Sequence, residues 1–184
     1  MTQNDREQLR DLLRARSVKR GDFVLSGGTR STFYIDARVT TMSGAGQLLI
    51  GRVGLDAMDA AGWGPQCVGG LTLGADPVAY ALAHAATRSG RELDAFTVRK
   101  EAKAHGTGRR IEGGFRPGAD VVVIEDVVTT GDSALRAIQV VEEAGARVLG
   151  VLTVVDREDS GRDRLERAGY ALVAVFTASE LLEQ

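Results

Sequence analysis

A chain of 184 residues with 43% hydrophobic side chains is long enough to bury a substantial core, which predicts a single domain over residues 1–184. Its 23 basic and 25 acidic residues give a formal net charge of −2, which argues against a dedicated nucleic-acid binder. The first twenty residues are rich in charge and no apolar run approaches a membrane span, so we expect a cytoplasmic protein that binds neither membrane nor nucleic acid.

The N-terminal segment begins with a helical pattern at residues 5–16 and continues into a predicted hairpin. Two short runs of aromatic and aliphatic residues, at 23–25 and 33–35, are separated by the turn-forming residues 26–29. We therefore expect these two runs to pair as antiparallel strands.

Helical patterns at 44–61 and 75–89 follow the hairpin, and they flank an apolar run at 66–70 that predicts a buried strand. This run contains the single cysteine of the chain, Cys67, which has no partner for an internal disulfide. We expect a buried, unreactive thiol there. A further strand is predicted at 93–98.

The strongest strand signal lies at residues 120–124, where Asp-Val-Val-Val-Ile is typical of a parallel strand covered on both faces. After it we expect a helix at 132–145, a strand at 147–155, a helix at 162–168 and a strand at 171–176. This alternation predicts an α/β fold, with a mainly parallel central sheet flanked by helices and right-handed crossovers. Ligands of such sheets bind outside the carboxyl ends of the strands.

The strand at 121–124 is followed directly by an acidic pair, a Thr-Thr-Gly turn and the start of a helix. In order, these residues are Glu125, Asp126, Val127, Val128, Thr129, Thr130, Gly131, Asp132 and Ser133. Backbone N–H groups and hydroxyls of the turn suit a phosphate group. The two carboxylates would repel a phosphate, so we expect them to bind ribose hydroxyls or a magnesium ion. Simple helix caps beside a solvated strand end are the alternative, but the four features in this order favour a combined phosphate and sugar site.

A second segment concentrates positive charge after the strand predicted at 93–98. Residues 99–110 contain five arginines or lysines and one histidine among several glycines. These features favour a mobile lid that closes over an anionic substrate. A solvated charged loop is the alternative, and a nucleic-acid patch is disfavoured because no aromatic residue lies among the charges to stack on bases.

Both segments carry a family resemblance. Residues 121–133 resemble the phosphoribosyl diphosphate motif of the type I phosphoribosyltransferases, and the order Arg-Lys-Glu-x-Lys-x-His-Gly from Arg99 resembles the catalytic loop of the orotate-specific members. The resemblance implies the type I phosphoribosyltransferase fold, with residues 1–40 forming part of a hood over the base. It also implies a glycosyltransferase that converts orotate and phosphoribosyl diphosphate to orotidine 5′-phosphate and pyrophosphate, in de novo pyrimidine biosynthesis.

The resemblance further implies a role for each matching residue. Glu125 and Asp126 would hold the ribose hydroxyls, with Asp126 stabilising a cationic transition state, and residues 129–133 would wrap the 5-phosphate. Lys103 would be the main catalytic cation. The implied phosphoribosyl diphosphate site consists of Arg99, Lys100, Lys103, His105, Glu125, Asp126, Val127, Val128, Thr129, Thr130, Gly131, Asp132 and Ser133.

The same resemblance implies a cofactor and an assembly. Mg²⁺ would be held mainly by the diphosphate and ribose of the substrate, without a direct protein ligand. The cationic loop would reach into the active site of a neighbouring subunit, which predicts a homodimer with shared active sites.

The base-binding residues come from two places. Phe33 and Tyr34 lie in a segment that resembles the hood of orotate enzymes and are expected to flank the pyrimidine ring, although aromatic residues in a hairpin also serve as core. Arg157 follows the strand at 147–155, where a guanidinium can grip the carboxylate of orotate, and a solvated arginine is the alternative. The resemblance adds Thr129 to the orotate contacts.

Two positions depart from the family pattern. Ser26 and Leu73 stand where many relatives carry lysines that contact phosphate, and no other residue is assigned these roles. Two rival functions remain open: a purine or uracil phosphoribosyltransferase, and a regulator that keeps the fold without catalysis. The near-neutral charge disfavours the regulator, and the constellation from Arg99 to His105 disfavours the other bases.

Overall fold

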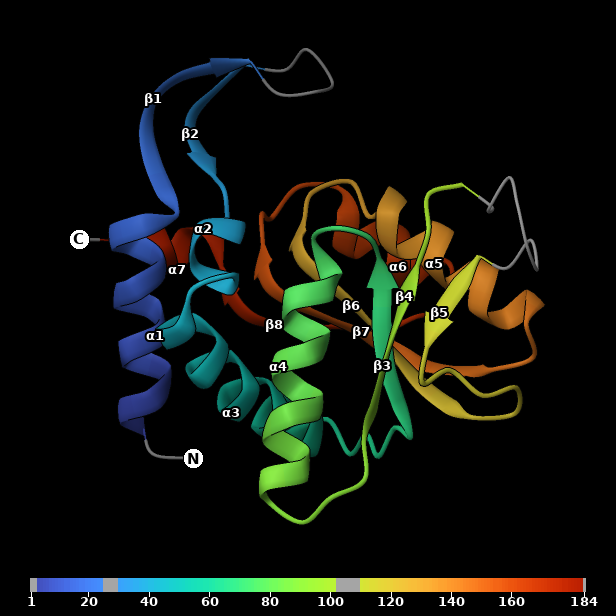
Figure 1. The fold of residues 1–184 in the computed structure, drawn as a ribbon. Helices are drawn as coiled ribbons and strands as arrows, with labels where there is room; N and C mark the ends of the chain where they lie inside the picture. Colours follow the sequence, from blue (N-terminus) through green and yellow to red (C-terminus); the bar gives the residue numbers. More distant parts are fainter. Residues whose placement is uncertain (1–2, 25–29, 102–109, 184) are drawn as a thin grey trace.

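The computed structural model describes residues 3–24, 30–101 and 110–183. Helix α1 (Gln3–Arg16) leads into an antiparallel hairpin of β1 (Val18–Val24) and β2 (Arg30–Ile35). The hairpin projects from one end of the molecule, above the remaining elements (Figure 1). The predicted hairpin is confirmed, while the residues expected to form its turn, 26–29, lie outside the described part of the chain.

The main sheet has six strands in the order β5-β4-β3-β6-β7-β8. These strands are β3 (Cys67–Leu71), β4 (Asp94–Val98), β5 (Ile111–Gly113), β6 (Asp120–Val128), β7 (Arg147–Asp156) and β8 (Leu172–Thr177). Neighbouring strands are parallel except for the antiparallel pair of β4 and β5. The expected mainly parallel sheet is confirmed, and only the short edge strand β5 was not predicted.

Helices cover both faces of this sheet. The helices after the hairpin are α2 (Arg38–Thr41), α3 (Gly44–Ala60), α4 (Ala75–Arg88), α5 (Asp132–Glu143), α6 (Gly161–Arg167) and α7 (Ala178–Leu182). Helices α3 and α4 lie on one face with α1 outside them, and α5 and α6 lie on the other (Figure 1). Within the described ranges, none of the helices combines the length and the apolar character that crossing a membrane requires.

Strand β6 shows why the sheet is covered on both sides. Val122 and Ile124 belong to the core under α3 and α4, whereas Val121 and Val123 belong to the core under α5 and α6. All four side chains are fully buried. Because successive side chains of a strand point to opposite faces, an unbroken β-branched run satisfies two cores at once. The predicted environment of this run is confirmed.

Strand β6 is longer than its apolar run. We expected the strand to end at Ile124, but it continues to Val128 and so includes the acidic pair. The reason is its partner: β7 pairs with β6 as far as Val128 opposite Asp156. Backbone hydrogen bonding to a neighbouring strand is not visible in the hydrophobic pattern of one segment, so the sequence did not reveal this extension.

The topology places one crevice at the carboxyl ends of the strands. From β3 the chain moves outward to β4, and from β6 it moves in the opposite direction to β7 and β8. Strands β3 and β6 are neighbours, so their carboxyl ends flank the point where the winding reverses. In open α/β sheets, ligands bind at such a point.

The close approach of β3 and β6 depends on Gly70. A Cβ atom at this position would lie 2.1 Å from the carbonyl oxygen of Ile124 and 2.8 Å from the Cβ of Ala75. We predict that Gly70→Ala lowers the free energy of unfolding by about 1–3 kcal/mol, because backbone must move to admit the methyl group. Urea unfolding followed by circular dichroism measures the change. Gly44→Ala is the matched control, since a Cβ there meets nothing within 4 Å, and an equal loss in both variants would contradict the packing argument.

Candidate active site

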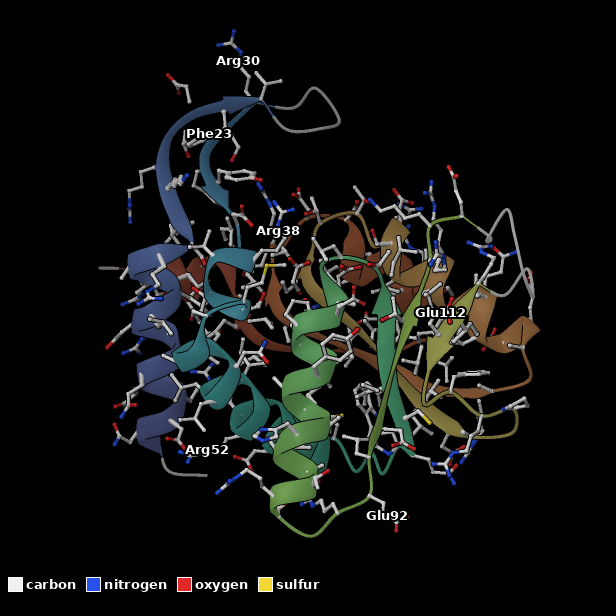
Figure 2. The ribbon with its side chains drawn as sticks, viewed as in Figure 1. Phe23, Arg30, Arg38, Arg52, Glu92 and Glu112 are labelled. Atoms are coloured by element: carbon white, nitrogen blue, oxygen red, sulfur yellow. The ribbon has the colours of Figure 1, made fainter. Side chains whose placement is uncertain are left out.

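A cleft of about 570 Å³ opens at the carboxyl ends of the strands, beneath the hairpin. Its walls come from β2, from the segments after β3 and β4, from β6 with the turn that follows it, and from the end of β7. The lining residues are Val24, Tyr34, Ile35, Asp36, Ala37, Arg38, Leu71, Thr72, Leu73, Gly74, Lys100, Glu125, Asp126, Val127, Thr129, Thr130, Ser133 and Arg157. Figure 2 shows Arg38 between the sheet and the hairpin that carries Phe23 and Arg30. The cleft therefore occupies the crevice that the topology specifies.

The turn after β6 presents its N–H groups rather than its carbonyls. The carbonyl of Thr129 accepts a hydrogen bond from the N–H of Gly161 (2.9 Å), and that of Thr130 accepts one from Nη1 of Arg164 (2.9 Å). Gly131 has a φ of 78°, which only glycine adopts readily. Among the described residues, no backbone or side-chain acceptor pairs with the N–H groups of residues 129–131. They border a small pocket of about 200 Å³, which is a suitable seat for an anion.

One acidic side chain, Asp132, and two hydroxyl side chains, Thr130 and Ser133, complete this turn. Asp132 forms an ion pair with Arg164 (2.7 Å) and accepts a hydrogen bond from the hydroxyl of Thr130 (2.8 Å). Hydrogen bonding to Arg164 lowers the pKa of Asp132. Ser133 lines the cleft and adds a hydroxyl there. Asp132 thus fixes the turn against α6 through Arg164. The N–H groups of residues 129–131 remain available to an anion.

The acidic pair lies at the base of the cleft in unfavourable surroundings for charge. Glu125 is only 7% exposed, and among the described residues its Oε2 atom has no hydrogen-bond partner. Burial, followed by the charge of Asp126, raises the pKa of Glu125 well above its usual range. Burial also raises the pKa of Asp126, while the N–H of Val127 and the charge of Arg38 act in the opposite direction. A buried carboxyl group, Glu125, and a partly buried one, Asp126, thus lie side by side where they can bind hydroxyl groups or a cation.

The side chain of Asp126 has room because of the residue that faces it. A Cβ atom on Gly74 would lie 2.4 Å from Oδ1 of Asp126. Gly74 belongs to the segment between β3 and α4, which forms the wall opposite the acidic pair. The two sides of the crevice therefore meet at this carboxylate.

Asp76 anchors that opposite wall, although no motif in the sequence points to it. Its carboxylate accepts hydrogen bonds from the hydroxyls of Thr72 (2.6 Å) and Thr97 (2.8 Å). The N–H of Thr72 also donates to the carbonyl of Val98 (2.8 Å). These contacts tie the segment after β3 to the end of β4. An aspartate in the first turn of a helix is usually explained by the helix dipole, so the sequence carried no signal for this bridge.

The predicted cations are divided between the cleft and its surroundings. Lys100 lines the cleft, whereas Arg99 pairs with Glu112 at 3.9 Å outside it. Lys103 and His105 lie outside the described residues. Arg38, to which the sequence analysis gave no role, lines the cleft and donates from Nε and Nη2 to Asp36 at 2.9 Å and 3.2 Å.

Arg157 lies beside the hairpin. The ring of Phe33 lies under its guanidinium, with Cζ 4.8 Å from the ring centroid. Tyr34, the next residue of β2, lines the cleft and packs against Phe23 with ring centroids 5.7 Å apart. The hairpin thus brings both predicted aromatic residues to this region, but Phe33 contacts Arg157 and is not among the lining residues.

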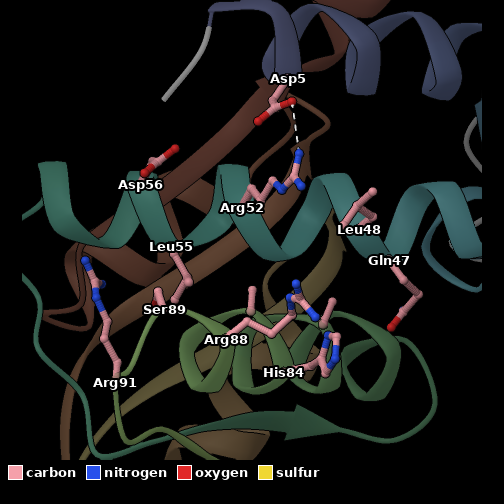
Figure 3. A pocket seen from close by; sticks show the side chains of 12 residues that line it. Asp5, Gln47, Leu48, Arg52, Leu55, Asp56, His84, Arg88, Ser89 and Arg91 are labelled. Carbon is pink, nitrogen blue, oxygen red and sulfur yellow. Dashed lines mark ion pairs between the residues drawn. The ribbon is translucent and has the colours of Figure 1, made fainter.

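A second pocket of about 370 Å³ lies between α3 and α4 (Figure 3). Its cations include Arg52, which pairs with Asp5 at 3.5 Å, and Arg91, which forms two hydrogen bonds with Asp59. None of the described residues that we selected from the sequence lines this pocket. The carboxyl-edge cleft is therefore the candidate active site.

This combination of a mainly parallel sheet, a hood and an acidic strand end followed by a phosphate-type turn defines the class of type I phosphoribosyltransferases. No protein-family model matches the chain. It is 45% identical over 181 residues to the orotate phosphoribosyltransferase of Aquifex aeolicus, covering 97% of this chain and 98% of the relative. The chain belongs to the orotate phosphoribosyltransferase family. It is accordingly a glycosyltransferase enzyme of pyrimidine biosynthesis.

Solved structures agree in fold over nearly the whole chain. The Mycobacterium tuberculosis orotate phosphoribosyltransferase in complex with Fe(III) dicitrate has a TM-score of 0.86 and 44% identity, covering 97% of this chain and 99% of the other. The same enzyme in complex with phosphoribosyl diphosphate has a TM-score of 0.82 and 41% identity, covering 96% and 98%. The predicted type I fold is confirmed.

Because the pKa of Glu125 is raised, replacing this side chain with a neutral one should stabilise the folded protein, by an amount that depends on pH. The folded state binds this proton more tightly than the unfolded chain, so the stabilisation is complete below the ordinary pKa of 4.5 and is lost as the pH rises through the folded-state value. We expect Glu125→Gln to raise Tm by about 2–4 °C near pH 8, equivalent to roughly 1 kcal/mol in a domain of this size. Near pH 4.5 the difference should shrink.

Differential scanning calorimetry at both pH values measures this effect. Glu183→Gln removes an exposed carboxylate and serves as the control, with Tm expected to stay within about 1 °C of wild type. A Tm for Glu125→Gln that stays below wild type at the higher pH would show that the buried carboxylate stabilises the fold.

Proposed function

We propose that the chain, acting as one domain with residues 1–40 as part of the hood, transfers ribose 5-phosphate from phosphoribosyl diphosphate to orotate. The products are orotidine 5′-phosphate and pyrophosphate. The observation that carries this proposal is one cleft of about 570 Å³ that joins an anion seat, an adjacent pair of carboxyl groups and a guanidinium. Phosphate, sugar and an acidic base require these three partners in this order along the substrate.

The substrates are assigned to the cleft by their chemistry. The 5-phosphate binds the free N–H groups of residues 129–131 and the hydroxyl of Ser133. The ribose hydroxyls donate to Glu125 and Asp126. The carboxylate of orotate meets Arg157, with Thr129 and Tyr34 beside the ring, since a guanidinium can bind a carboxylate through two parallel hydrogen bonds.

Catalysis then depends on electrostatics. A ring nitrogen of orotate attacks the anomeric carbon as the bond to the diphosphate breaks, so positive charge develops on the ribose and negative charge on the leaving group. The carboxylate of Asp126 stabilises the first, and the cations Arg99, Lys100, Lys103 and His105 stabilise the second. We expect the cationic loop to close over the substrate and exclude water, which would otherwise hydrolyse the activated sugar.

Mg²⁺ fits this site as a companion of the substrate. Within the described ranges, no three histidine, cysteine or acidic side chains are grouped to hold a metal by themselves. The acidic pair does offer oxygen atoms, including the unpaired Oε2 of Glu125, and Mg²⁺ commonly combines one or two carboxylates with substrate phosphates and water. When bound, the ion would neutralise charge on the departing diphosphate.

The direct test follows the ultraviolet absorbance of orotate in the presence of phosphoribosyl diphosphate and Mg²⁺. We expect consumption of orotate that requires both additions, with uracil, adenine and hypoxanthine as inactive bases. Removing Mg²⁺ with a chelator should reduce the rate at least ~10-fold. Activity on uracil or a purine with none on orotate would contradict the proposal, and binding of phosphoribosyl diphosphate without turnover on any base would favour a regulator.

An apolar surface supports a homodimer. Large hydrophobic side chains that are about half exposed lie on α2 and directly after it, on α3, on α4 and on the segment before α4. They are Val39, Met42, Leu48, Leu73 and Tyr80. Exposed apolar groups on neighbouring elements favour burial against a second surface. Leu73 also lines the cleft, so a second copy seated here would bring its own residues to the active site. We propose that this partner supplies the cationic loop in a cytoplasmic, twofold-symmetric dimer.

Complementation between two inactive variants tests the shared site. Asp126→Asn should lower turnover by ~100-fold or more, because it removes a negative charge that stabilises the cationic transition state. Lys103→Ala should also be nearly inactive. If the two are unfolded and refolded together in equal amounts, about half the dimers contain one chain of each. One of the two sites in each mixed dimer then has both working parts, so activity should recover to roughly a quarter of wild type.

Native mass spectrometry provides the control by confirming that mixed dimers have formed. If each loop served its own subunit, neither site of a mixed dimer would be complete. Activity that stays at the level of the single variants despite mixed dimers would therefore rule out the shared site.

A further inference from the structure

Arg157 lines the cleft, yet its side chain is only 8% exposed. The hairpin and a neighbouring loop cover it. The ring of Phe33 lies against the guanidinium at 4.8 Å, the hydroxyl of Ser31 lies 3.4 Å from Nη2, and Oδ2 of Asp159 lies 3.4 Å from Nε. The guanidinium is thus contacted by two residues of the distant hairpin and by Asp159 of its own loop.

Unlike the contacts with Ser31 and Asp159, the contact with Phe33 uses none of the N–H donors of the guanidinium. A phenyl ring attracts a cation to its face without accepting an in-plane hydrogen bond. The N–H groups at the edge of the guanidinium therefore keep their capacity to donate to a carboxylate. Nε of Arg157 is buried and faces Asp159, and Nη2 makes only a long contact with Ser31. Within the described residues Nη1 has no hydrogen-bond partner, so the outer edge of the guanidinium retains donor capacity.

Strand geometry separates the two aromatic residues of β2. Successive side chains of a strand point to opposite faces. Accordingly Phe33 contacts Arg157, whereas Tyr34 lines the cleft and packs against Phe23. We expected Phe33 to flank the base, but its ring lies against Arg157.

We propose that Phe33 is a positioning residue for orotate specificity: it acts through Arg157, by fixing the plane of the guanidinium, and does not contact the base. This inference rests on the proposed role of Arg157 in binding the orotate carboxylate. Through Phe33, the hairpin would then contribute to recognition of the base without contacting the base at that residue.

A double-mutant cycle tests the inference. The variants are Phe33→Leu, Arg157→Ala and the double variant, and the measured quantity is kcat/KM for orotate at saturating phosphoribosyl diphosphate. Phe33→Leu should lower kcat/KM for orotate by about 3–10-fold, the range expected for loss of one cation–π contact. KM for phosphoribosyl diphosphate should stay unchanged. In the Arg157→Ala background, Phe33→Leu should have no further effect, because the group through which it acts is gone.

Phe33→Tyr is the matched control, since it keeps the ring, and it should retain wild-type kcat/KM for orotate. This variant also guards against a general folding defect in Phe33→Leu, which thermal melting of both variants would reveal. If Phe33→Leu lowers kcat/KM equally with and without Arg157, Phe33 contacts the base directly and the inference is overturned. If Arg157→Ala alone leaves orotate unaffected, the fault lies in the proposed role of Arg157 itself.

Discussion

The site depends on one constraint, the pairing of β6 with β7 beyond the apolar core. The ladder continues to Val128 opposite Asp156, and the N–H of Arg157 then donates to the carbonyl of Val128 at 2.9 Å. This pairing fixes the acidic pair on one strand and the guanidinium of Arg157 on the next, along the same edge. Because the backbone of both strands is held by hydrogen bonds, the charged side chains project from a rigid base. The turn that follows β6 inherits its position from the same ladder.

That rigidity comes at an electrostatic cost. Glu125 is buried, the adjacent Asp126 is partly buried, and both have a raised pKa, a combination that a fold selected for stability alone would avoid. The surroundings limit the cost: Val127 donates its N–H to Asp126, and Arg38 lies near enough to lower its pKa. A substrate with ribose hydroxyls would satisfy the oxygen atoms that the protein leaves unpaired. Carboxyl groups with perturbed pKa values of this kind are typical of functional sites.

Several features could be predicted because they depend on local chemistry. The β-branched run in β6 specified a strand covered on both faces, and its core clusters confirm this. The Thr-Thr-Gly turn was recognisable because residue types and order define an anion seat. Other features could not be predicted, because they depend on contacts between distant segments. The length of β6 depended on β7, and the bridge from Asp76 to Thr72 and Thr97 joins segments whose meeting no local pattern encodes.

The sequence by itself therefore determined the family, the α/β alternation and the chemical parts of the site, since each is written in contiguous residues. The tertiary structure alone decided which of these parts meet. It brought Phe33 of the hairpin against Arg157 across more than a hundred residues, and it set Gly74 opposite Asp126. Contacts of this kind follow from how the hairpin and the strand ends converge on one crevice. Their energy depends on distances between distant segments, which no single stretch of sequence contains.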